Sequence, residues 1–254
     1  MIISDAVHAL DRELRGIFGA RLQSLSIYGT PRHAQGDRDA HGAQPHASHA
    51  AHGHNHPPTT TLAVVESMTH DDLRGCAGRI AVWHDAGLAT PLLIAAREFE
   101  RSLDAFPLEF GAIVANHVVV AGGSPFASLK VDPADVRRAC EVQARSHLLH
   151  LREGYLETRA RADALSVLIV QSAGAFTALV ASVARLEGHA SDDPAAAARH
   201  VERILNLPDG PVTEVAKLVG VQEISSADAE RLFAPYLDAV ERLVNYVDGW
   251  NSGR

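Results

Sequence analysis

Histidines crowd one segment of the chain, at spacings that could hold a metal ion. Of the 15 histidines in 254 residues, a large share lies between His33 and His56. The candidate ligands are His46, His49, His52, His54 and His56. In an extended chain, imidazoles separated by one residue can reach the same ion, and sites rich in nitrogen favour Zn²⁺, Ni²⁺, Cu²⁺ or Co²⁺. One interpretation is therefore a metal-binding protein that holds zinc or nickel in this loop.

The same loop also has the composition of a linker. Residues 31–58 are rich in Ala, Gly, Pro and His, a composition that predicts a disordered segment. Each doubling of a surface loop costs only about 0.6 kcal/mol, so a fold tolerates such an insertion without any benefit from it. Both interpretations can hold, because a disordered chain can still chelate a metal ion.

Arg145 and His150 form a second pair with chemical potential. Their spacing matches the loose Arg-x4-His pattern of helical ribonucleases found in toxin–antitoxin systems. In such an enzyme the histidine would act as acid or base, and the arginine would stabilise phosphate charge. The other interpretation is a solvated helix face, on which His147 and Glu153 are also expected to be surface residues.

The composition is that of an ordinary globular protein. Hydrophobic residues make up 46% of the chain and charged residues 21%, and the net charge is −8, which argues against bulk binding to nucleic acid or to an anionic membrane. Cys76 and Cys140 have no Cys-x-x-Cys spacing, which favours a reducing compartment. With no signal-like segment and no apolar run of membrane-spanning length, we expect a cytoplasmic protein.

Helix and strand patterns alternate in the first half of the chain. Ser4-Asp5 can cap a helix in which apolar residues recur at three- and four-residue spacing. The expected strands lie at 22–28, 62–65, 91–95 and 116–120, with helices over 69–87 and 98–103 between them. These patterns predict an α/β region over residues 1–130, with the histidine-rich loop 31–58 inside it.

Strand patterns vanish after Asp132-Pro133, and helical patterns replace them. The expected helices run from about 133 toward 161, and over 166–186, 194–205 and 227–247. Asp192-Asp193 is interpreted as an acidic helix cap. These patterns predict a helical bundle over residues 131–254. The chain as a whole is therefore expected to be an α+β protein. The apolar residues of helix 166–186 suit either a core or the face of a homodimer.

The order of these elements resembles that of the nucleotidyltransferase superfamily, the DNA polymerase β-like fold. The segments Phe106–Phe110, His117–Gly123 and Leu148–Leu156 look like an uncharacterised bacterial branch of that superfamily. The resemblance extends from about the first strand to the second long helix. It implies a mixed sheet with flanking helices, followed by a helical bundle.

The resemblance also implies which residues would form the site. In active members, a Gly-Ser turn holds the triphosphate and an Asp-x-Asp pair coordinates Mg²⁺; here Gly29-Thr30 stands at the turn, and Thr59 and Thr61 stand in place of the two aspartates. The third strand, at 91–95, also has no acid. Because threonine is a poor substitute for a metal-binding carboxylate, we expect a degenerate transferase that binds a nucleotide or a protein partner.

An active enzyme is the alternative. Glu66, Glu98 and Glu109 could supply relocated carboxylates for Mg²⁺ and nucleotide, although each also has an ordinary structural or solvated role open to it. The ribonuclease and the metal-binding protein are the remaining candidates.

Overall fold

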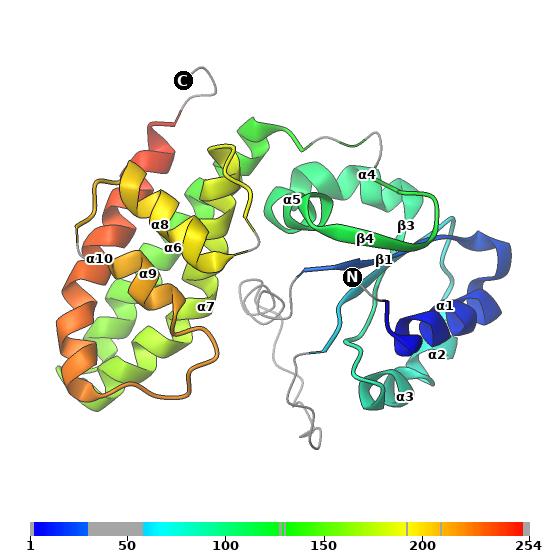
Figure 1. Ribbon diagram of the computed structural model, residues 1–254, viewed down its shortest axis with the longest axis horizontal. Helices are drawn as coiled ribbons and strands as arrows, with labels where there is room; N and C mark the ends of the chain where they lie inside the picture. Colours follow the sequence, from blue (N-terminus) through cyan, green and yellow to red (C-terminus); the bar gives the residue numbers. More distant parts are fainter. Residues whose placement is uncertain are drawn as a thin grey trace. The chain divides into compact units, whose positions relative to one another are not determined.

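The computed structural model describes residues 3–29, 58–126, 129, 131–191, 193–208 and 210–250. These residues form two compact units, which divide between Val131 and Asp132. The first unit contains a sheet with helices, and the second is made of helices (Figure 1). The chain is therefore an α+β protein, as its sequence predicts.

A mixed sheet organises the first unit. Its strands are β1 (Leu22–Tyr28), β2 (Thr61–Val65), β3 (Leu92–Ala95) and β4 (His117–Gly122), in the order β3-β2-β1-β4. β1 runs antiparallel to β2 and β4, whereas β2 and β3 run parallel. The end of β1 and the start of β2 therefore share one end of the sheet, and the ends of β2 and β3 share the other.

Helices cover both faces of this sheet. α1 (Asp5–Phe18), α2 (His70–Ala77) and α3 (Ile80–Asp85) lie on one face, and α4 (Ala96–Ala105) and α5 (Pro107–Ala115) lie on the other (Figure 1). Side chains alternate along a strand, so Ala63 and Val65 join the core beneath α1, while Leu62 and Val64 pack with Phe99. Burial on both faces explains why β2 is a nearly continuous apolar run.

The predicted elements of this unit are mostly confirmed. All four strands are present close to their expected positions. The helix expected over 69–87 is instead two short helices, because the chain turns at Gly78 and Arg79 between them. α5 was not expected; it starts with Pro107 in its first turn, where proline is well tolerated.

The described residues of the second unit form five helices. They are α6 (Pro133–Glu157), α7 (Ala162–Leu186), α8 (Pro194–Ile204), α9 (Pro211–Ala216) and α10 (Ser226–Asp248). Asp193 caps α8, because its Oδ1 accepts a hydrogen bond of 2.9 Å from the amide of Ala195, which confirms the expected role of this acid. The short helix α9 was not expected.

α7 is the central helix of this bundle. It contacts α6, α8, α9 and α10. Among the described helices it alone is long and apolar enough to cross a membrane, and 56% of its most apolar stretch is buried inside the structure. One such helix is weak evidence for a span, since the core helix of a bundle has the same composition. Its contacts account for its apolar character.

Candidate functional site

The predicted site lies at the end of the sheet where β1 stops and β2 begins. The amide of Tyr28 donates to the carbonyl of Thr60 (3.2 Å), and this pairing continues the β1–β2 ladder toward Gly29 and Thr59. Thr59 is also tied to the turn before β3, since its amide donates to the carbonyl of Gly87 (2.9 Å). We call Gly29, Thr59, Thr60 and Thr61 the glycine–threonine end.

Gly29 ends β1 in a conformation that favours glycine. Its φ of +69° lies in the left-handed region, and it is exposed. Its amide hydrogen bonds to the carbonyl of Asn116 at 3.4 Å. A β-carbon here would have space, with Thr60 Oγ1 at 3.5 Å, so backbone strain rather than crowding makes glycine the suitable residue.

The three threonines lie in different environments. Thr59 is half-buried, whereas Thr61 is fully buried. The Oγ1 atom of Thr61 is buried and has no hydrogen-bond partner among the described residues, while the hydroxyl of Thr60 donates to the carbonyl of Tyr28. The structure therefore brings Gly29 and Thr59 together at the surface and places Thr61 inward. Thr30 lies outside the described residues.

The described residues do not fit a two-metal transferase centre. They contain no group of three or more His, Cys, Asp or Glu side chains that could hold a metal ion. Mg²⁺ is held by carboxylates together with substrate phosphates, and the glycine–threonine end supplies hydroxyl and backbone groups instead. No step of metal-assisted transfer can be built from these residues.

Two of the three carboxylates proposed to replace the missing acids lie at the other end of the sheet. Glu66 directly follows β2, where its amide donates to the carbonyl of Arg21 (2.8 Å). Glu98 lies just after β3 and accepts a hydrogen bond of 3.2 Å from the amide of Ala95 at the start of α4. Because β2 and β3 are parallel, both residues belong to the end opposite Thr59. Glu109 lies in the first turn of α5 and is half-buried.

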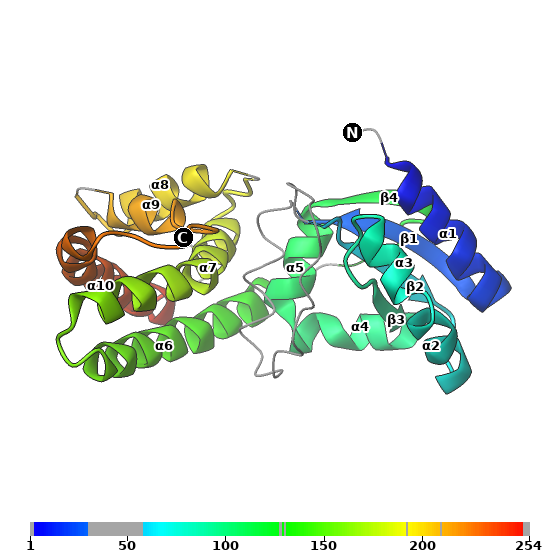
Figure 2. The same cartoon turned by 90° about the horizontal axis from the view of Figure 1, so that it is seen from below.

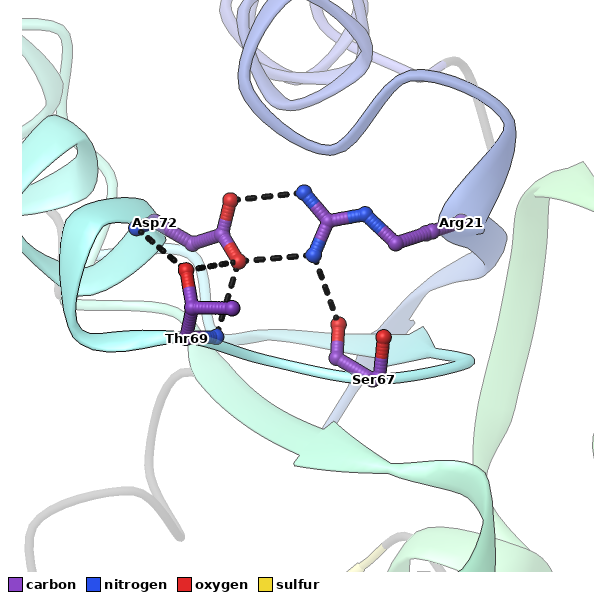
Figure 3. A network of polar contacts seen from close by, with 4 residues as sticks. All are labelled: Arg21, Ser67, Thr69 and Asp72. Atoms are coloured by element: carbon purple, nitrogen blue, oxygen red, sulfur yellow. Dashed lines mark hydrogen bonds and ion pairs between the residues drawn. The ribbon is translucent and has the colours of Figure 1, made fainter.

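That opposite end carries an ion-pair network, which we call the Arg21–Asp72 end. Arg21 donates to both carboxylate oxygens of Asp72, at 2.7 Å each, and to the carbonyl of Ser67 at 3.1 Å (Figure 3). Asp72 also accepts from the amide and the hydroxyl of Thr69, both at 2.8 Å, in a capping box that starts α2.

The charges of this network stabilise one another. The hydrogen bonds from Arg21, followed by those from Thr69, hold the pKa of the Asp72 carboxyl well below its ordinary value of 3.8. The same pairing raises the pKa of Arg21. Arg21 and Asp72 are 51 residues apart, so the sequence does not predict this pair. Its one local signal is the Thr69–Asp72 spacing, which is typical of a capping box.

The ribonuclease-like pair is not assembled as a site. Arg145 donates to Glu141 (3.2 Å) and to Asp248 of α10 (2.8 Å), and both contacts raise its pKa. The Nδ1 atom of His150 lies 3.4 Å from the hydroxyl of Ser146, and both residues are exposed. Arg145 thus connects two helices, and the described contacts do not join it to His150.

The expectation that His147 is a surface residue is wrong. His147 is half-buried, and its Nε2 atom lies 2.7 Å from the hydroxyl of the fully buried Tyr236, which donates to Ser172 at 3.1 Å. Burial, followed by the proximity of His150, lowers the pKa of His147 to about 4. The ring stacks on Phe176, so this histidine is part of the packing of the bundle.

The histidine-rich loop lies outside the described residues. Its candidate ligands are His46, His49, His52, His54 and His56. Metal binding by the loop therefore stays a prediction from the sequence.

Comparison with known proteins adds no family. No protein-family model matches the chain, and no curated protein matches it.

Proposed function

We propose that the first unit is a nucleotidyltransferase-like binding module that holds a nucleotide without transferring it. The observation that carries this proposal is the division of groups between the two ends of the sheet. The glycine–threonine end offers an exposed left-handed glycine and the hydroxyl of Thr59, while Glu66 and Glu98 lie at the other end. Binding a phosphate requires donors, whereas transferring it in the way of the superfamily that the chain resembles also requires carboxylates that hold metal ions.

The donor set suits a nucleoside triphosphate bound without metal. The Thr59 hydroxyl can donate to a phosphate oxygen, and a turn that contains glycine lets the backbone approach an anion closely. The amides of Gly29 and Thr59 already donate to the carbonyls of Asn116 and Gly87, so the hydroxyl is the main donor in this proposal. The four residues of the glycine–threonine end include no arginine or lysine, so this end lacks the cationic contacts that strengthen phosphate binding, and the chain carries a net charge of −8. We therefore expect weak binding that is governed by local contacts rather than by long-range attraction.

Calorimetry on the full chain tests this proposal. ATP and GTP are titrated with and without Mg²⁺, and a parallel assay follows transfer of a labelled nucleotide to protein, RNA and small acceptors. We expect binding of similar affinity in both conditions and no transfer. Micromolar binding that appears only with Mg²⁺, or any transfer lost on Glu109→Gln, would show that the enzyme interpretation is right. If neither nucleotide binds, the proposed nucleotide-binding function is wrong, and this end of the sheet has only a structural role.

Two neighbouring threonines provide a matched pair of variants. Thr59→Val removes a half-buried hydroxyl from the proposed contact surface, and Thr61→Val removes a fully buried one. We expect the first change to weaken nucleotide binding several-fold and the second to leave it unchanged. Equal loss in both variants would point to a general effect on folding rather than to contact with the ligand.

The other candidates stay as proposals with separate tests. A protein partner could use the same end of the sheet, and competition between that partner and ATP would reveal it. Metal binding by residues 33–56 would be abolished by deleting them and would not require nucleotide. The ribonuclease requires His150 and no metal, and the ion pairs of Arg145 do not favour it.

A further inference from the structure

One helix of the second unit has apolar side chains on its outer surface. Val142, Leu149 and Leu156 of α6 are 65%, 63% and 76% exposed. The inner side of the same helix is already buried through Cys140, Ala144 and Leu151, and Figure 2 shows α6 along one side of the bundle, with α7 and α10 toward its other side. α6 therefore has a second apolar line that none of the described helices of the bundle covers. We call it the α6 ridge.

The spacing of this ridge is typical of a helix that packs against another helix. Single exposed apolar residues are common on protein surfaces and need no explanation. Three of them at intervals of seven residues lie on nearly one line, because seven residues make almost two turns of helix. The ridge runs for about 21 Å along α6, at about 1.5 Å per residue. This length suits contact with a second helix lying alongside.

Charged residues form a regular row on one side of the ridge. Arg138, Arg145 and Arg152 also recur at intervals of seven residues. They pair with Asp135 (3.0 Å), with Asp248 (2.8 Å) and with Glu241 (2.7 Å), respectively. Because Asp248 and Glu241 belong to α10, this row lies toward that helix.

The opposite side of the ridge differs in charge. Ser146 and Glu153 lie there, four and eleven residues after Val142, and both are exposed. Within the described parts of the chain, Glu153 makes no ion pair, whereas each arginine of the opposite row makes at least one. One flank thus presents arginines that are already paired with acids, and the other carries an acid that makes no ion pair with the described residues.

We propose that the α6 ridge is covered by the α6 ridge of a second copy of this chain, with the two helices parallel and related by a two-fold axis along them. In that arrangement each apolar residue meets its own counterpart, so Val142, Leu149 and Leu156 are covered together. The two-fold axis also brings the arginine flank of one helix against the Ser146–Glu153 flank of the other. Arg152 then lies beside the Glu153 carboxylate of the second copy.

An antiparallel pair would also cover the apolar line, but it would bring like flanks together. Arg145 of one helix would then approach Arg152 of the other, and Glu153 would still have no arginine. Charges of the same sign placed side by side oppose association. The charge pattern therefore favours the parallel pair.

Sedimentation velocity on the full chain at micromolar concentration provides the first test. We expect twice the mass of one chain, and the mass of one chain for Leu149→Asp. Leu73→Asp is the matched control, because Leu73 is 44% exposed on α2 in the other unit and this variant should stay dimeric. Thermal unfolding confirms that both variants are folded. A monomeric native chain, or a dimer that Leu149→Asp does not dissociate, would overturn the proposal.

Disulfide cross-linking tests the direction of the helices. Val142→Cys should form a cross-linked dimer by itself if the helices are parallel, whereas antiparallel helices would cross-link only when Val142→Cys is mixed with Leu156→Cys. Both native cysteines are buried, and burial raises the pKa of Cys140 to about 12, so they do not compete. Glu153→Arg should weaken the dimer several-fold, and unchanged affinity would contradict the parallel arrangement.

Discussion

The two ends of the sheet in the first unit differ in the polar groups they carry and in how those groups are paired. At the Arg21–Asp72 end, two hydrogen bonds of 2.7 Å join the arginine to the carboxylate, and the hydroxyl of Thr69 donates to the same carboxylate. At the glycine–threonine end, the described residues Gly29, Thr59, Thr60 and Thr61 carry no charge, and the Thr61 hydroxyl has no partner. The charges of Arg21 and Asp72 are thus paired with each other, whereas the glycine–threonine end has no charged group to pair.

This contrast separates stability from binding within one small sheet. A carboxylate that already accepts four hydrogen bonds contributes to the fold and has little capacity left for a ligand. Uncharged donors at an exposed strand end cost less to desolvate and can turn toward an incoming phosphate. Changes at the Arg21–Asp72 end should therefore affect folding most, and changes at the glycine–threonine end should affect binding or produce small shifts in stability.

The largest expected effect is at Gly122, where β4 pairs with β1 near the Arg21–Asp72 end. Gly122 has a φ of +78°, and a β-carbon there would lie 1.9 Å from the carbonyl oxygen of Gln23. Gly122→Ala should destabilise the protein by about 4 kcal/mol or more, because the backbone of both strands must shift. Denaturant unfolding measures the loss.

Gly123 is the matched control for this change. A β-carbon at Gly123 would meet nothing within 4 Å, and its φ is outside the left-handed region. Gly123→Ala should change the free energy of unfolding by no more than about 0.5 kcal/mol. Similar losses in the two variants would mean that the close approach of β1 to Gly122 is not a constraint.

The next effect in size is the loss of the Asp72 charge. Asp72→Asn removes the charge that pairs with Arg21 and weakens the cap of α2, so we expect a lower melting temperature in calorimetry. Asp71→Asn is the control, since Asp71 is exposed and makes only a surface pair with Arg74, a type of contact that contributes about 0–1 kcal/mol. If the two variants have the same melting temperature, the network contributes no more to stability than a surface ion pair does.

Acid titration of stability tests the same network by another route. The folded protein holds the pKa of Asp72 below its ordinary value of 3.8, so the stabilisation is present above pH 3.8 and is lost as the pH falls toward the lower folded value. The difference in stability between the native chain and Asp72→Asn should therefore be constant near neutral pH and should shrink below about pH 4. A difference that stays constant into strong acid would mean that the carboxylate does not titrate as its contacts require.

Local patterns explain what the sequence could predict. The alternation of β1, the apolar run of β2 and the acidic cap at Asp193 each depend on neighbouring residues, so they can be read without tertiary contacts. The change from mixed structure to helices near Asp132 is equally local, since a proline in a first turn and a continuous helical pattern follow it.

Long-range contacts explain what the sequence could not predict. Arg21 and Asp72 are 51 residues apart, and His147 and Tyr236 are 89 apart, so no short pattern indicates that either pair meets. The positions of Glu66 and Glu98 depend on strand direction: only the parallel pairing of β2 and β3 shows that they lie away from Thr59. The sequence predicted which residue types form the candidate site. That these residues are divided between two ends of the sheet follows only from the strand topology.

The smallest expected effect contrasts two adjacent threonines of the glycine–threonine end. Thr61 has a buried hydroxyl that finds no partner in the part of the chain that the structure describes, whereas the hydroxyl of Thr60 donates to the carbonyl of Tyr28. A buried polar group without a hydrogen bond is costly, and a formed hydrogen bond contributes about 1 kcal/mol. Because valine has nearly the shape of threonine, Thr61→Val should raise the free energy of unfolding by about 1 kcal/mol, and Thr60→Val should lower it by about the same amount. Denaturant unfolding of both variants gives the signs directly, and a loss in Thr61→Val would mean that this hydroxyl has a partner in solution.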